Sequence, residues 1–194
     1  MSNLADTLNA CLPKTVKTSG PILTTRSINE SFMKRAGEAC FFEAWVGAVL
    51  CRCGLYVKHL PMVIAQNRQD LKTMGYSWDL EVSPDELIGE RVEVKSTQQW
   101  FDSILTYPDK DVFVCSQSNF NKKWPNQNKT GSHFLFVSKK TGNIVWLPKG
   151  SVTTQNVVRK DYSRGETFKA VTATSSKLKS LEAFVEVMNG LKKK

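Results

Sequence analysis

The sequence predicts an α/β domain in which a mixed β-sheet is flanked by helices. Residues 35–50 form one long, mostly apolar run of helical length, and several later runs alternate apolar and polar residues as strands do. With 194 residues and 41% hydrophobic content, the chain can bury one core. We therefore expect a core domain over residues 28–175, an N-terminal arm over 1–27, and a C-terminal helix with a basic tail over 176–194.

The first regular element is a helix that we expect to begin near Ser27 and to stop by Gly54. Ser27 and Glu30 have the spacing of a capping box, and a glycine suits the position after a helix. The arm before it has no sustained periodicity and contains helix-breaking Pro and Gly, so we expect it to be partly irregular. A strand over Leu55 to Val63 should follow the helix.

Two short strands, Trp78–Val82 and Arg91–Ser96, are expected next, joined as a hairpin. In both runs every second residue is apolar and the residues between are mostly charged, so one face of each strand should be buried. Pro84 and Gly89 stand near the two ends of the link, which suits a turn.

A turn centred in this link would bring Asp79 opposite Glu93 and Lys95 on one face of the hairpin. Carboxylates are the ligands that Mg²⁺ prefers, and a bound divalent ion acidifies water and neutralises charge on a phosphodiester under attack. Lys95 could hold the phosphate or orient the water, and the Val94 carbonyl is a further candidate ligand. The pattern therefore predicts phosphodiester hydrolysis with Mg²⁺, for which Mn²⁺ could substitute.

A helix followed by Asp79 and then by Glu93-Val94-Lys95 resembles the PD-(D/E)XK superfamily of restriction-endonuclease-like nucleases. The similarity covers roughly residues 30–147 as an order of elements and depends on about four residues. It implies a restriction-endonuclease-like core and a metal-dependent deoxyribonuclease, which we expect to be an endonuclease.

In that family a glutamate on the first helix often binds the metal, directly or through water. Glu38 and Glu43 are the two candidates in this chain. We prefer Glu43 because it stands seven residues before Leu50 and eleven before Gly54, a spacing similar to that of related nucleases.

The sequence leaves a rival for Asp79. The family pattern has proline before the aspartate, whereas Trp78 precedes Asp79 and the literal Pro84-Asp85 lies closer to Glu93. We prefer Asp79 because family aspartates stand at the start of the strand before the Glu-x-Lys strand, and Asp85 falls in the turn. Alternating charges on a solvated strand face would give the same pattern without catalysis.

The charge balance favours DNA as the partner. Lys and Arg number 27 against 18 Asp and Glu, a formal charge of +9 that attracts a polyanion, although a membrane surface would compete as an explanation. Residues 119–132 are the most polar and basic internal stretch, and a solvated loop whose tryptophan caps the core is the alternative to DNA contact there. The candidate DNA-contact residues are Gln98, Lys122, Lys123, Trp124 and Lys129. A nucleic-acid-binding protein without cleavage activity is the alternative function.

The remaining elements complete the sheet and cover it. Val112–Cys115 and Phe134–Ser138 should be buried strands, and residues 142–147 an edge strand. Ser176–Leu191 has apolar residues at helical spacing, so we expect an amphipathic helix docked on the body or on the second subunit of a homodimer.

Cellular location and redox state follow from what the sequence contains. No run approaches the roughly 20 apolar residues of a membrane span, and the N-terminus has no apolar signal region, so we expect a soluble cytoplasmic protein without a membrane partner. The five cysteines form no C-x-x-C pair and are odd in number, which favours reduced thiols over disulfides or a zinc site.

Overall fold

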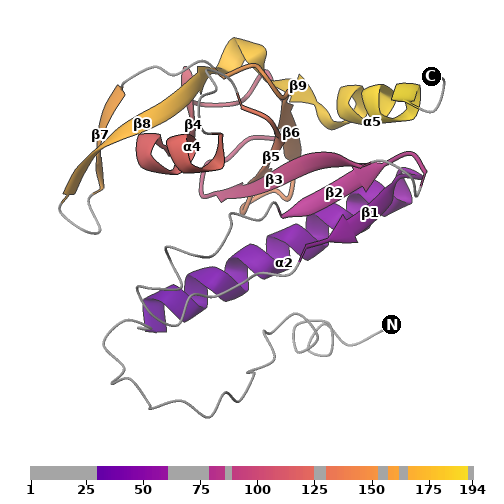
Figure 1. Ribbon diagram of the computed structural model, residues 1–194, viewed down its shortest axis with the longest axis horizontal. Helices are drawn as coiled ribbons and strands as arrows, with labels where there is room; N and C mark the ends of the chain where they lie inside the picture. The colour runs from indigo at the N-terminus through magenta and orange to yellow at the C-terminus, as the bar shows by residue number, and fades with distance from the viewer. Residues whose placement is uncertain are drawn as a thin grey trace.

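The computed structural model describes residues 30–60, 79–85, 89–124, 130–152, 157–161 and 166–191 (Figure 1). The arm expected over residues 1–27 and the basic tail therefore lie outside the described residues. The elements in chain order are α2 (Glu30–Arg52), β1 (Tyr56–His59), β2 (Leu80–Ser83), β3 (Glu90–Thr97), β4 (Asp111–Ser116), α4 (Gln117–Lys123), β5 (His133–Ser138), β6 (Ile144–Leu147), β7 (Val157–Asp161), β8 (Glu166–Thr174), the 3-10 turn η1 (Ser175–Lys177), β9 (Lys179–Ser180) and α5 (Leu181–Gly190).

Six of the strands form one mixed sheet in the order β1-β2-β3-β5-β6-β9. All neighbours in it are antiparallel except β3 and β5, which run parallel. The strands β4, β8 and β7 form a second, antiparallel sheet. In Figure 1, α2 runs beneath the β1–β3 side of the large sheet, and α4 lies on the other side with the small sheet. The predicted α/β class with a mixed sheet and a C-terminal helix is confirmed.

Helix α2 ends where the sequence predicts. Arg52 is its last residue, and Gly54 follows with a φ of 81°, a left-handed conformation that glycine adopts without steric cost. Val46 and Leu50 are fully buried against the sheet, so the apolar run is held by packing rather than by propensity alone. The expected cap Ser27 lies outside the described residues, as does the end of the strand predicted to run from Leu55 to Val63.

The predicted hairpin is present, with the expected faces. Leu80 pairs with Val92 and Val82 with Glu90, so the same register extended by one residue aligns Asp79 with Glu93. The apolar residues of both strands join one core cluster with α2 and α5; they are Leu80, Val82, Val92 and Val94. Their charged neighbours along each strand consequently point to the opposite face of the sheet.

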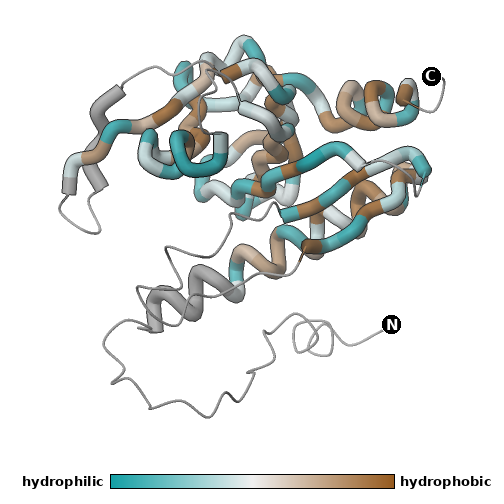
Figure 2. The backbone as a smooth tube through the Cα atoms, viewed as in Figure 1, coloured by the Kyte–Doolittle hydropathy of each residue, from teal (hydrophilic) through white to brown (hydrophobic). Residues whose placement is uncertain are grey.

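Strand β5 is the centre of the core because both of its faces are buried. Leu135 and Val137 pack in the cluster shared with α2 and α5, whereas Phe134 and Phe136 pack in a second cluster with β4, α4 and β8. Figure 2 shows β5 and β6 as largely hydrophobic segments and α4 as a largely hydrophilic one. A parallel strand between two layers is expected to be apolar on both sides.

Residues 119–132, the predicted DNA-contact stretch for which a solvated loop was the alternative, begin within helix α4. The Ser116 hydroxyl accepts a hydrogen bond from the backbone N–H of Asn119 and so caps the helix. Phe120 and Trp124 are buried, with ring centroids 5.1 Å apart, and this tertiary packing stabilises a helix too short to be stable alone.

Two further segments differ from the expectation. Strand β6 is not an edge strand, because Val145 and Trp146 pair with the short β9. We made no prediction for β7 and β8. Strand β8 pairs with β4 and with β7, and its residues Val171 and Ala173 belong to the second core cluster.

The C-terminal helix is shorter than the predicted Ser176–Leu191 and docks on the protein's own body. It begins after Ser180, whose hydroxyl accepts a hydrogen bond from the N–H of Ala183. Phe184 and Met188 are buried in the cluster that contains α2. Within the described ranges, no helix combines the length and apolar character needed to cross a bilayer.

Candidate functional site

Glu93 is the centre of the candidate site. Its side chain is only 1% exposed, and each of its oxygens lies against a lysine: Oε2 is 3.1 Å from Nζ of Lys95, and Oε1 is 2.9 Å from Nζ of Lys123. Burial alone would raise the pKa of this carboxyl, but the two ammonium groups outweigh burial and lower it. Glu93 is therefore a buried carboxylate that is ionised at neutral pH.

Asp79 approaches the same place from the strand alongside. Its Oδ2 accepts a hydrogen bond of 2.7 Å from the backbone N–H of Val94, the residue between Glu93 and Lys95. Burial raises the pKa of Asp79, with Glu93 adding to the effect, while Lys95 and the Val94 N–H oppose it. The contact of Val94 with the site thus runs through its N–H, and the role of its carbonyl as a ligand stays a prediction.

Lys95 remains charged at neutral pH. Burial favours the neutral amine, but the carboxylates of Glu93 and Asp79 outweigh burial and raise the pKa of Lys95. A lysine with a raised pKa does not accept a proton near pH 7, so Lys95 can act on an anionic group as a fixed positive charge but not as a general base.

The helix acid nearest to these groups is Glu43. Burial and the charge of Asp79 raise the pKa of Glu43 to about 7, and Lys95 partly opposes the shift. Glu38 instead forms an ion pair with Lys139 in the turn between β5 and β6. The charges of Asp79 and Lys95 thus act on Glu43, which favours Glu43 over Glu38, and its role as a metal ligand stays a prediction.

Glu43 is expected to cost the metal-free protein stability at neutral pH. Its pKa is raised on folding, so its stabilising contribution is complete below about pH 4.5 and is lost as the pH rises through 7. In EDTA at pH 8, we expect Glu43→Gln to stabilise the protein by about 1 to 2 kcal/mol, allowing for the water that still reaches the side chain, or roughly 3 to 6 °C in Tm. Thermal unfolding of both proteins at pH 5 and pH 8 measures this.

The matched control is Glu38→Gln on the same helix. This change removes the ion pair with Lys139 and should give no gain in Tm at either pH. A Glu43→Gln gain that is equal at pH 5 and pH 8 would contradict the assignment, because the protonated carboxyl at pH 5 already resembles the amide.

The donor chemistry of the site fits a hard divalent cation. Three carboxylates, from Glu43, Asp79 and Glu93, face two ammonium groups, which leaves an excess of negative charge. Crowding of acids adds to burial in raising the pKa of Glu43 and Asp79, and a cation would offset both effects. As the side chains stand, however, no three His, Cys, Asp or Glu of the described ranges converge closely enough to hold an ion.

Asp85 is placed away from this cluster. It follows the end of β2 at Ser83, on the link to β3, and the Ser83 hydroxyl donates to its backbone carbonyl. The charges that shift the pKa of Glu93 come from Lys95 and Lys123, whereas Asp79 is the acid that contacts the Glu-x-Lys strand.

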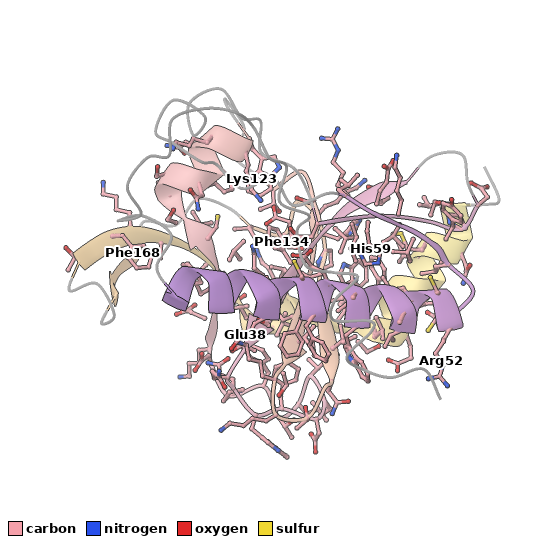
Figure 3. All side chains as sticks on the ribbon, turned by 90° about the horizontal axis from the view of Figure 1, so that it is seen from below. Glu38, Arg52, His59, Lys123, Phe134 and Phe168 are labelled. Carbon is pink, nitrogen blue, oxygen red and sulfur yellow. The ribbon has the colours of Figure 1, made fainter. Side chains whose placement is uncertain are left out.

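The predicted DNA-contact residues do not share one environment. Lys122 and Gln98 are exposed, whereas Lys129 lies outside the described residues. Trp124 is only 3% exposed and packs on Phe134, with ring centroids 6.1 Å apart, so the prediction that its ring stacks on a base is wrong and the alternative of a core-capping tryptophan holds. Lys123, labelled in Figure 3, has its Nζ 2.9 Å from Oε1 of the buried Glu93.

The contact between Lys123 and Glu93 is what sequence reasoning missed. The two residues are thirty positions apart and belong to elements joined through β4, so no local spacing indicates the pair. The only available signal was the helix itself, because Ser116 as a cap and Phe120 with Trp124 four residues later are typical of a short buried helix.

No protein-family model, no curated protein and no solved structure matches this chain.

Proposed function

We propose that the protein is a Mg²⁺-dependent DNA nuclease that cleaves phosphodiester bonds internally. The observation that carries the proposal is that Asp79, Glu93 and Lys95 gather at the open end of one hairpin. Glu43 of α2 interacts electrostatically with Asp79 and Lys95. A carboxylate as deeply buried as Glu93 is costly without cations, which favours a functional role over a solvated strand face.

The same proposal includes a restriction-endonuclease-like core. A long helix, the strand after it and the hairpin that carries Asp79 and Glu93 occur in the order that the resemblance implies, and this order supports the assignment. The chain adds the small sheet of β4, β8 and β7 to that core.

Each residue of the site has a role in this proposal. Asp79 and Glu93 would hold the cation, with Glu43 and the Val94 carbonyl completing the ligand set. When bound, the ion would lower the pKa of a water and offset charge on the phosphate. The permanently charged Lys95 would hold the scissile phosphate, and exposed basic residues such as Lys122 would contact the DNA backbone.

Incubation with supercoiled plasmid tests this function. We expect conversion to open-circular or linear DNA in Mg²⁺ or Mn²⁺ and no conversion in EDTA. A circular substrate has no ends, so cutting it distinguishes an endonuclease from an exonuclease. No cleavage of circular or linear DNA with either metal would refute the nuclease proposal.

A second candidate is a DNA-binding protein that does not cleave. The observation in its favour is that both oxygens of Glu93 are covered by lysines, so the carboxylate is already neutralised within the protein. Salt-sensitive DNA binding that persists while no cleavage occurs in any metal would support this candidate.

A further inference from the structure

Lys123 enters the candidate site from outside the Asp and Glu-x-Lys pattern. It is the last residue of α4, and its side chain is 14% exposed although Lys122 beside it is exposed to solvent. Figure 3 shows Lys123 at the end of α4 nearest to the strand that carries Phe134. A lysine held this far from water needs an anionic partner, and Glu93 provides one.

The position of Lys123 is fixed by packing on both sides of it along the chain. Phe120 and Trp124 are 1% and 3% exposed, and Trp124 packs on Phe134, which is the partner of Glu93 in the β3–β5 register. The end of α4 is thus anchored against β5 beside Glu93 of the neighbouring β3, and the ammonium group of Lys123 meets the Glu93 carboxylate there.

The contact that Lys123 makes is one that another cation could replace. Its Nζ lies 2.9 Å from Oε1 of Glu93, and a different cation at that oxygen would offset the same buried charge. The other oxygen of Glu93 already faces Lys95 at 3.1 Å. Both oxygens of Glu93 thus face an ammonium group, so a metal ion that used Glu93 as a ligand would compete with one of the two lysines. Lys95 keeps its role at the phosphate in the proposed function, which leaves Lys123 as the competitor.

We propose that Lys123 is an internal counter-ion that occupies the coordinating oxygen of Glu93 and is displaced when a divalent cation binds. This inference depends on the proposed metal site. Lys123 keeps the buried carboxylate neutralised while the cation is absent, and it lowers the cation affinity because two positive charges compete for one oxygen.

Titration of the full-length protein with Mn²⁺ by calorimetry tests this inference without measuring activity. We expect Lys123→Met to tighten Mn²⁺ binding about tenfold, because the competing charge is gone and the aliphatic stem is kept. Lys122→Met removes a neighbouring charge of the same helix that is exposed, and it should change the affinity by less than about twofold.

The outcomes separate this inference from the proposed function. Unchanged or weaker Mn²⁺ binding by Lys123→Met, with metal-dependent cleavage present in the native protein, would overturn the inference alone. Absence of Mn²⁺ binding in the native protein and in both variants would overturn both proposals.

A measurement on the native protein covers the case in which Lys123→Met does not fold. Amine acetylation followed by mass spectrometry reports how accessible each lysine is. Saturating Mn²⁺ should increase labelling of Lys123 several-fold and leave Lys122 unchanged. Equal labelling of Lys123 with and without saturating Mn²⁺ would show that its ammonium group is not displaced.

Discussion

Replacing Lys95 by methionine is expected to lower plasmid cleavage by about 100- to 1,000-fold, the usual cost of removing one fixed group that stabilises charge in a transition state. Methionine keeps most of the length and volume of lysine and removes only the charge. Since the carboxylates beside Lys95 raise its pKa, the native side chain is an ammonium throughout neutral pH, and the loss should be nearly independent of pH between about 6 and 9.

Two further variants separate charge from fold. Lys95→Arg keeps the positive charge but changes its geometry, so partial activity would identify the charge as the active feature. Lys58→Met removes a lysine that is 64% exposed on the neighbouring part of the same sheet, where it pairs with Glu81, and it should cleave like the native protein. Lys95→Met activity within threefold of native, with an unchanged unfolding temperature, would exclude Lys95 from the reaction.

A pH-independent loss would also identify what Lys95 does not do. If Lys95 accepted the proton of the attacking water, cleavage by the native protein would fall steeply as the pH dropped below the pKa of its amine. The carboxylates of Glu93 and Asp79 make the neutral amine that a general base requires unfavourable. The pH profile of kcat in the native protein should therefore show no ionisation that disappears in Lys95→Arg.

The hairpin and its register could be predicted because the information is local. A period of two in both strands determines which residues share a face, and a short link determines which residues are opposite. Asp79 and Glu93 are aligned by the same register that pairs Leu80 with Val92. The preference for Glu43 over Glu38 came instead from the resemblance, since it depends on a spacing similar to that of related nucleases.

The contacts that could not be predicted join distant parts of the chain. Lys123 reaches Glu93 because Phe120 and Trp124 pack in the same core cluster as Phe134, and side-chain packing of this kind leaves no periodic signal. The asparagines of α4 have modest helix propensity, so tertiary contacts override a composition typical of a loop. The strand β8 escaped prediction because it alternates small and polar residues with few large apolar ones.

The proposed catalytic residues and the proposed competitor of the cation differ in how local they are in the sequence. The residues that would perform chemistry lie on local patterns, whereas Lys123, which would set the affinity for the cation, depends on the three-dimensional packing of a short helix. A chain with the same Asp and Glu-x-Lys pattern but without this helix would keep the carboxylates and the lysine of the pattern. Its glutamate, however, would pair with one lysine instead of two. Cation affinity cannot therefore be derived from the pattern alone.

Comparison of Asp79→Asn with Asp85→Asn should give the second large effect. We expect Asp79→Asn to lower cleavage at least about 100-fold, since loss of a metal ligand forfeits a share of the several kcal/mol that the ion contributes, and each 1.4 kcal/mol is about tenfold. Asp85→Asn should remain within about threefold of native, because Asp85 lies past the end of β2 and not opposite the Glu-x-Lys strand.

Asp79→Asn removes the negative charge of the side chain and should leave the local structure unchanged. Asp79 accepts the N–H of Val94 through Oδ2, and the amide oxygen of asparagine can accept the same hydrogen bond, so the edge of the hairpin should stay in register. Removal of an acid whose pKa is raised by burial should also leave unfolding stability equal or slightly higher at neutral pH. Lost cleavage in Asp79→Asn with an undiminished Tm therefore indicates a catalytic role, whereas loss confined to Asp85→Asn would transfer the ligand role to the Pro84-Asp85 pair.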